Sequence, residues 1–172
     1  MKTLVLGGVR SGKSRYAAAL ARELSMPVTL IATGTALDEE MRRRIAAHRR
    51  DRDADWTVVE EPVHLAGALI EVSSPDRVII VDCLTLWLTN LLCAGGDALR
   101  RESSSFLTAL PGLPGHCVMV ANEVSLGIIP VNELARRFMD EAGDLHQQLA
   151  ACCDRVVFMV AGLPLTVKAA PP

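Results

Sequence analysis

Residues 3–20 read TLVLGGVRSGKSRYAAAL, and the order of features in this stretch indicates one fold class. An apolar run leads into a glycine-rich loop that matches G-x-x-x-x-G-K-[ST], and an amphipathic segment follows; this is the P-loop arrangement of nucleoside triphosphate-binding proteins. Gly7 and Gly12 let backbone N–H groups turn inward toward phosphate oxygens. Lys13 supplies a point charge, and the Ser14 hydroxyl is placed to ligate Mg²⁺. The residues expected to hold the triphosphate are Gly7, Gly8, Val9, Arg10, Ser11, Gly12, Lys13 and Ser14.

Short apolar runs rich in β-branched residues recur along the chain, and helix-like segments lie between them. The runs are uniformly apolar rather than alternating, which is typical of strands covered on both faces in a mostly parallel sheet. The sequence therefore predicts an α/β fold with helices on each side of the sheet. The predicted strands cover residues 3–7, 28–33, 56–60, 77–82, 116–122 and 155–162.

Two of the predicted helices carry specific expectations. Pro62 suits the first turn of a helix, which would place His64 inside an amphipathic helix. A later helix has an apolar stripe formed by Leu134, Phe138, Ala142 and Leu145, a pattern that is typical of a core or subunit contact.

Composition limits the function classes. The 172 residues, without repeats or linkers, predict a single domain over residues 1–172. A net charge of −2 and a pI near 6.1 argue against bulk nucleic-acid binding. No apolar run reaches the roughly 18 residues of a membrane span, and no cleavable signal is evident. Free thiols in a reducing cytoplasm are expected because the cysteines lack C-x-x-C spacing and are odd in number: Cys83, Cys93, Cys117, Cys152 and Cys153.

Polar residues at two predicted strand ends each have two interpretations. Asp82 lies where the Mg²⁺-associated carboxylate of a P-loop protein is found, but it could equally cap the helix that starts near Leu84. Asn122 and Glu123 lie where parallel sheets place their ligand crevice, but they could also cap the following loop.

His48 lies in a segment crowded with arginine, DEEMRRRIAAHRRDRDADW (38–56). Met41, Ile45 and His48 are spaced to share one helix face, so the plain interpretation is a solvated basic helix with a partly buried histidine. The alternative is a nucleophile, because neighbouring guanidinium groups keep an imidazole neutral and also stabilise charge on a triphosphate. The other histidines, His64, His116 and His146, have no comparable setting and are predicted to be structural.

Several motifs in order resemble one family along nearly the whole chain. They are GGVRSGKS at the P-loop, IAT (31–33), DEEM-x₃-I-x₂-H-R, W-x₃-E at Trp56 and Glu60, LTNLL (88–92) and NEV-x₂-GI-x-P from Asn122. Together they are similar to the bifunctional adenosylcobinamide kinase / adenosylcobinamide-phosphate guanylyltransferase family of cobalamin assembly. Ser125, Met139 and His146 stand where that family usually has glycine, arginine and asparagine.

The resemblance implies two reactions and a set of site residues. Adenosylcobinamide would be phosphorylated with ATP or GTP, and GMP would then pass from GTP to adenosylcobinamide phosphate through a guanylylated His48. The resemblance also implies a RecA-like, P-loop NTPase-type α/β/α fold with one antiparallel strand, and a homotrimer. The implied nucleotide contacts beyond the P-loop are Ala32, Thr33, Gly34, Arg49, Arg50, Asp51, Arg52, Glu60 and Asp82, with Ser14 and Asp82 serving Mg²⁺.

Two other function classes remain open on the sequence alone. A monofunctional P-loop kinase would transfer only the γ-phosphate, and His48 would be structural. A nucleotide-switch protein would hydrolyse slowly and need no acceptor. A covalent nucleotide on the protein would distinguish the bifunctional enzyme from both.

Overall fold

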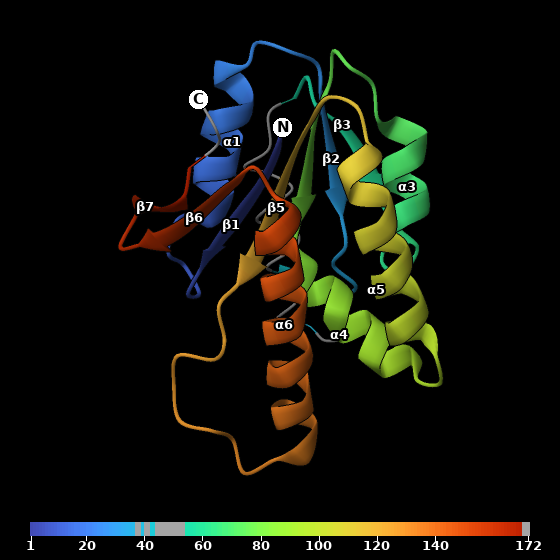
Figure 1. Ribbon diagram of the computed structural model, residues 1–172, viewed down its shortest axis with the longest axis vertical. Helices are drawn as coiled ribbons and strands as arrows, with labels where there is room; N and C mark the ends of the chain where they lie inside the picture. The colour runs from blue at the N-terminus through green and yellow to red at the C-terminus, as the bar shows by residue number, and fades with distance from the viewer. Residues whose placement is uncertain (37–38, 40–41, 44–53, 170–172) are drawn as a thin grey trace.

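The computed structural model describes residues 1–36, 39, 42–43 and 54–169, which build one mixed β-sheet with helices on both faces (Figure 1). The strand order is β3-β2-β4-β5-β1-β6-β7, and each neighbouring pair is parallel except β6 with β7. The strands are β1 (Lys2–Gly7), β2 (Val28–Ala32), β3 (Thr57–Glu60), β4 (Val78–Asp82), β5 (His116–Asn122), β6 (Arg155–Val160) and β7 (Leu163–Lys168). The expected α/β class and the single antiparallel strand are therefore confirmed.

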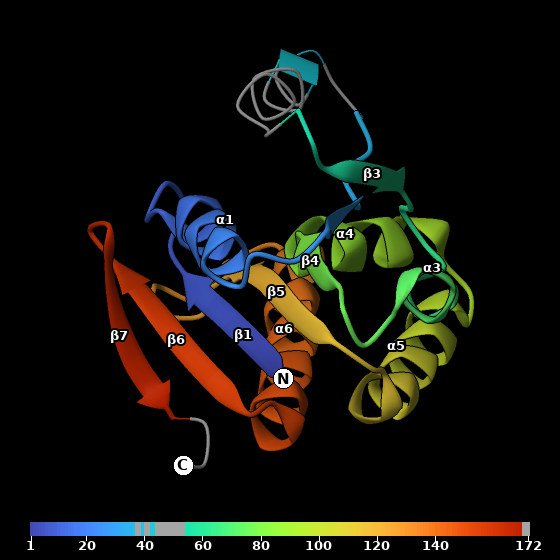
Figure 2. The same cartoon turned by 90° about the horizontal axis from the view of Figure 1, so that it is seen from above.

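The helices divide between the two faces of the sheet (Figure 2). They are α1 (Lys13–Glu23), α3 (Leu65–Val72), α4 (Leu84–Ala94), α5 (Ala98–Ala109) and α6 (Glu133–Cys152), with a 3₁₀ turn at Leu110–Gly112. Alternate residues of each central strand face opposite layers. In β4, Val78 and Ile80 pack with α1, whereas Ile79 and Val81 pack with the layer of α3 to α6. Both faces are apolar, which explains why the strands read as continuous apolar runs.

One aromatic pair lies at the centre of the larger apolar layer. Trp87 of α4 and Phe106 of α5 are fully buried, and their rings meet edge to face with centroids 5.4 Å apart. The indole N–H of Trp87 donates to the Val63 carbonyl at 2.8 Å, so the segment before α3 is tied to α4. With only 3% aromatic residues, aliphatic side chains fill most of the remaining core.

The prediction that a helix opens at Pro62 is wrong by three residues. The Glu61 carboxylate accepts the backbone N–H groups of Val63 and His64 at 2.8 and 2.7 Å, so a turn precedes the helix. His64 is the N-cap residue rather than a helical one, and α3 begins at Leu65. The His64 side chain is exposed, and its Nδ1 lies 3.3 Å from the Glu102 carboxylate.

Two further features of the fold differ from the sequence-based expectations. The buried positions of α6 are Ala142, Leu145 and Leu149, and Phe138 packs partly buried against the same core, whereas Leu134 is 59% exposed and lies outside the core of this chain. The pattern of apolar residues predicted no strand after residue 162, yet β7 (Leu163–Lys168) pairs with β6. No helix in the described part of the chain is long and apolar enough to cross a membrane.

Candidate functional site

The carboxyl ends of five strands bring the predicted site residues to one edge of the sheet. Ala32 at the end of β2 is the register partner of Glu60 in β3 and of Asp82 in β4. Gly7 at the end of β1 is the register partner of Asn122 in β5. Since β5 also pairs with β4, these strand ends form a continuous row. Parallel α/β sheets bind their ligands at this edge.

The P-loop follows β1 and leads directly into α1. Gly7 adopts φ +151°, and a Cβ there would lie 2.6 Å from the Met159 carbonyl oxygen, so only glycine fits between the loop and β6. Ser11 N–H donates to the Gly8 carbonyl at 3.2 Å and closes the loop. Gly12 is the N-cap of α1, which directs the positive end of the helix dipole toward the loop.

Lys13 and Ser11 give this loop the chemistry that a phosphate requires. Lys13 is 7% exposed, and its ammonium donates to the Gly8 carbonyl at 2.6 Å, which holds the charge over the loop. Burial lowers the pKa of Lys13, although Cys83 and Asp82 act to raise it. The Ser11 hydroxyl is buried without a hydrogen-bond partner in the described structure. A phosphate oxygen would supply the acceptor that this hydroxyl lacks.

Asp82 ends β4 at the same edge as the P-loop. The N-cap position of α4 is taken by Cys83 rather than Asp82, so the alternative role of Asp82 as a helix cap gains no support. The negative charge of Asp82 acts to raise the pKa of Lys13. A carboxylate together with the Ser14 hydroxyl is a donor set that suits Mg²⁺. The described residues contain no cluster of three His, Cys, Asp or Glu side chains that could hold a metal ion.

Thr33 holds two of the strand ends together. It is fully buried; its hydroxyl donates to the Cys83 carbonyl at 2.6 Å and accepts the Cys83 N–H at 3.0 Å. The Asn90 side-chain amide donates to the carbonyls of Thr33 and Pro62 at 2.8 and 3.0 Å. Gly34, predicted with Thr33, is the half-buried residue that follows. Thr33 therefore supports the site edge by connecting the end of β2 to the end of β4.

Sequence reasoning did not assign a role to Asn90 or to Thr85. The Thr85 hydroxyl accepts the Asn122 N–H at 2.7 Å, which fixes the end of β5 against α4. Both residues are polar positions in the mostly apolar stretch LTLWLTNLLCA (84–94), which also contains Thr89, and that contrast was the available signal. Their partners are distant in sequence and could not be identified without the fold.

The histidine segment is mostly outside the described residues. His48, Arg49, Arg50, Asp51 and Arg52 all lie there, and so do Met41 and Ile45. Of the predicted basic cluster, Arg42 and Arg43 are described; both side chains are exposed and form ion pairs with Glu39. Glu60, the last residue of β3, is exposed at the site edge.

Comparison with known proteins places the chain in a family. The model of the cobinamide kinase / cobinamide phosphate guanyltransferase family matches residues 3–167. The chain belongs to this family. It is therefore a nucleotide-using transferase of a cobalamin biosynthesis family, as the resemblance of its motifs predicted.

Two of the relatives that match the chain over almost their full length illustrate the similarity. The bifunctional adenosylcobalamin biosynthesis protein CobP of Pseudomonas aeruginosa is 51% identical over 172 residues, covering 99% of both chains. The bifunctional adenosylcobalamin biosynthesis protein CobU of Escherichia coli K12 is 40% identical over 182 residues, covering 98% of this chain and all of the relative.

Solved structures are similar in fold alone. The RadB recombinase has a TM-score of 0.54 at 16% identity and covers 91% of this chain and 73% of its own. The type III secretion ATPase EscN has a TM-score of 0.51 at 12% identity, covering 92% of this chain and 41% of its own. These neighbours confirm the P-loop NTPase-type fold of this member of the cobinamide kinase / guanyltransferase family.

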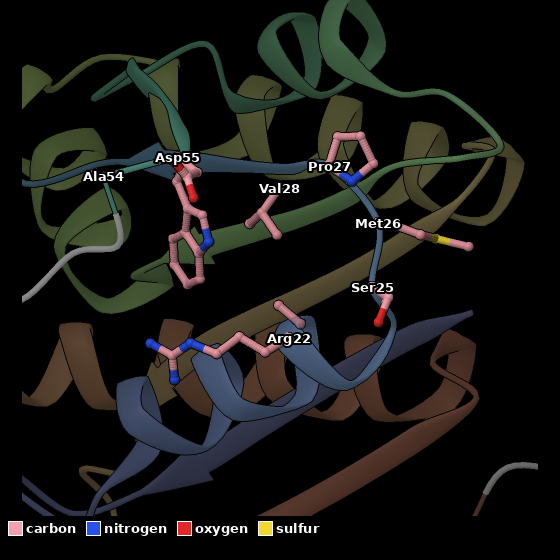
Figure 3. A pocket seen from close by; sticks show the side chains of 9 residues that line it. Arg22, Ser25, Met26, Pro27, Val28, Ala54 and Asp55 are labelled. Carbon is pink, nitrogen blue, oxygen red and sulfur yellow. The ribbon is translucent and has the colours of Figure 1, made fainter.

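A hollow lies near the start of β2, away from the strand ends that carry the P-loop (Figure 3). This cavity of about 370 Å³ lies between the end of α1, the start of β2 and the residues before β3. The Arg22 guanidinium is 5.9 Å from the Trp56 ring centroid, within the range of a cation–π contact. Trp56, which belongs to the family-like W-x₃-E motif, therefore packs against α1 and lies at the other end of β3 from Glu60.

Proposed function

We propose that this chain phosphorylates adenosylcobinamide with ATP or GTP and then transfers GMP from GTP to adenosylcobinamide phosphate, releasing pyrophosphate. The observation that carries the proposal is the full-length match to relatives named bifunctional, in a chain whose P-loop is complete at the ligand-binding edge of the sheet. Both reactions use a triphosphate, so one P-loop serves them in turn.

In the kinase half, the P-loop holds the triphosphate while the acceptor hydroxyl attacks the γ-phosphate. Lys13 and the loop N–H groups from Gly7 to Ser14 stabilise the charge on the phosphates. Ser14 and Asp82 would hold Mg²⁺, which when bound neutralises phosphate charge and orients the transferred group. The low exposure of Lys13 strengthens its interaction with phosphate, because less water screens the charge.

In the transferase half, His48 is the proposed nucleophile. Its neutral imidazole attacks the α-phosphate of GTP, the bond to the bridging oxygen breaks, and pyrophosphate leaves with the electron pair. The acceptor phosphate then attacks the guanylyl-histidine and regenerates His48. The proposed nucleotide contacts in this half, carried over from the family resemblance, are Ala32, Thr33, Gly34, Arg49, Arg50, Asp51, Arg52 and Glu60.

The proposal includes the assembly and the location of the enzyme. A homotrimer in the cytoplasm is consistent with five unpaired cysteines and with large exposed apolar side chains on β7 and on the loop before α6. The exposed side chains of that loop are Leu126, Ile128, Ile129 and Val131. A single functional domain over residues 1–172 also remains a prediction.

Separate assays of the two half-reactions test the proposed function. Purified protein is incubated with adenosylcobinamide and γ-labelled ATP or GTP, and separately with adenosylcobinamide phosphate and α-labelled GTP. The bifunctional enzyme labels the corrinoid in both. Label only from the γ-phosphate would identify a monofunctional kinase, and hydrolysis without labelled corrinoid would favour a nucleotide switch.

A further inference from the structure

Glu123 adjoins the P-loop through its backbone and has no role in the function described so far. Asn122, the last residue of β5, is the register partner of Gly7, and Glu123 follows it. The backbone N–H of Glu123 donates to the Gly7 carbonyl at 3.0 Å. The position of Glu123 is therefore fixed relative to the first residue of the phosphate-binding loop.

The two oxygens of the Glu123 carboxylate have different surroundings. Ser125 holds Oε1, because its backbone N–H donates to that oxygen at 2.6 Å and its hydroxyl donates to the same atom. Oε2 lies 4.0 Å from Nδ1 of His146, which comes from α6. The side chains of Glu123 and His146 are only 15% and 12% exposed. A residue that only closes the loop turn would need no more than the two Ser125 contacts. Turn closure therefore does not explain why the side chain is sheltered or why its second oxygen, Oε2, faces α6.

The pKa of each member of this pair departs from its ordinary value. Burial acts to raise the pKa of Glu123, but hydrogen bonds from Ser125 and the nearby His146 outweigh it, and the net pKa is lowered. Burial lowers the pKa of His146, and Glu123 opposes this only in part. Both shifts favour an ionised carboxylate beside a neutral imidazole.

We propose that Glu123 is the general base of the kinase half-reaction, an inference that rests on the proposed function. The acceptor hydroxyl oxygen forms a bond to the γ-phosphorus, and its proton passes to the Glu123 carboxylate. The bond between the γ-phosphorus and the bridging oxygen breaks, and its electron pair leaves with the nucleoside diphosphate. Glu123 later releases the proton to water. The Ser125 contacts hold the side chain in place during the transfer.

The two half-reactions make this inference separable from a general structural role. An alcohol must lose a proton as it attacks, whereas the acceptor phosphate of the guanylyl transfer has no proton to lose at its attacking oxygen near neutral pH. The loss of a general base should therefore slow the first half much more than the second.

The test compares Glu123→Gln and Glu123→Asp with wild type in both half-reactions. The glutamine variant keeps an acceptor for Ser125 but cannot accept the proton, so its kinase kcat should fall by about 100-fold or more. Its nucleotide KM should stay near the wild-type value, and its guanylyl transfer to adenosylcobinamide phosphate should fall at least tenfold less than its kinase activity. The aspartate variant keeps the carboxylate and should retain more kinase activity than the glutamine variant. Glu133→Gln, at an exposed position in the first turn of α6, is the matched control and should leave both rates unchanged.

Two results would overturn the inference while leaving the proposed function intact. One is a glutamine variant whose kinase kcat is close to that of wild type. The other is a kinase activity that is equal or lower in the aspartate variant than in the glutamine variant, which would indicate loop closure rather than proton transfer. A wild-type chain that does not phosphorylate adenosylcobinamide at all would instead overturn the proposed function, and this inference with it.

Discussion

Lys13 combines burial with positive charge at the P-loop, so its removal should separate function from stability. In Lys13→Ala we expect both half-reactions to slow by about 100-fold or more, because a preorganised charge at the phosphates is lost. Thermal stability should not fall, since the desolvation of a buried ammonium no longer opposes folding.

Initial rates of each half-reaction and a thermal unfolding curve test this prediction. Arg137→Ala is a suitable control, because Arg137 of α6 is exposed. Its ion pair with Glu141 is long, at 4.0 Å, and therefore contributes little to stability. A Lys13→Ala variant with near wild-type turnover would show that another group binds the phosphates.

His146 gives a pH-dependent contribution to stability at the residue scale. Burial lowers its pKa below the ordinary value of 6.5, so below that value the unfolded chain binds the proton more readily than the folded one. The stabilising effect is therefore complete above the unfolded pKa and is lost as the pH falls. His146→Gln should lose less free energy of unfolding than wild type between about pH 7 and about pH 5.5.

Denaturant unfolding of both proteins at the two pH values measures this difference. Equal losses would mean that His146 takes up its proton at the same pH in both states.

At the scale of elements, the β6–β7 hairpin forms one wall of the P-loop. Gly162 in its turn adopts φ +84°, and its N–H donates to the Ser11 carbonyl at 3.0 Å. Gly162→Ala should destabilise the fold by about 1 kcal/mol or more and raise the nucleotide KM, because the left-handed conformation is strained in alanine and the turn supports the loop.

Gly143 of α6 provides the opposite control, since a Cβ there meets no atom within 4 Å. Gly143→Ala should stabilise the protein by about 0.5–1 kcal/mol without changing the nucleotide KM. If both alanine variants changed KM equally, the hairpin would have no special relation to the P-loop.

Some helices and strands can be predicted from local sequence, and others cannot. The P-loop and six strands were predicted because their signals are contiguous: a fixed motif and apolar runs covered on both faces. β7 was not found from its residues, because it is an outer strand that contains Pro164 and exposes Leu163, Leu165 and Val167. The network of Thr33, Cys83 and Asn90 was missed for a different reason, since its hydrogen bonds join residues that are distant in sequence.

At the scale of the whole molecule, exposed apolar side chains favour self-association. Leu163, Leu165 and Val167 are 71%, 59% and 65% exposed along β7, which is the outer strand of the sheet. We expect sedimentation equilibrium to give three times the chain mass of 18.5 kDa, and Leu165→Lys to lower the assembled fraction. A wild-type mass of one chain at micromolar concentration would contradict the proposed trimer.

The central proposal is that one chain both uses a P-loop and carries a covalent nucleotide on His48. Folded wild type, His48→Ala and the control His64→Ala are incubated with Mg²⁺ and GTP labelled at either the α- or the γ-phosphate, then denatured. We predict acid-labile label from the α-phosphate alone on wild type and on His64→Ala, and none on His48→Ala. A wild type that binds GTP but retains no label, or a His48→Ala variant that is labelled like wild type, would contradict the guanylyl-histidine mechanism.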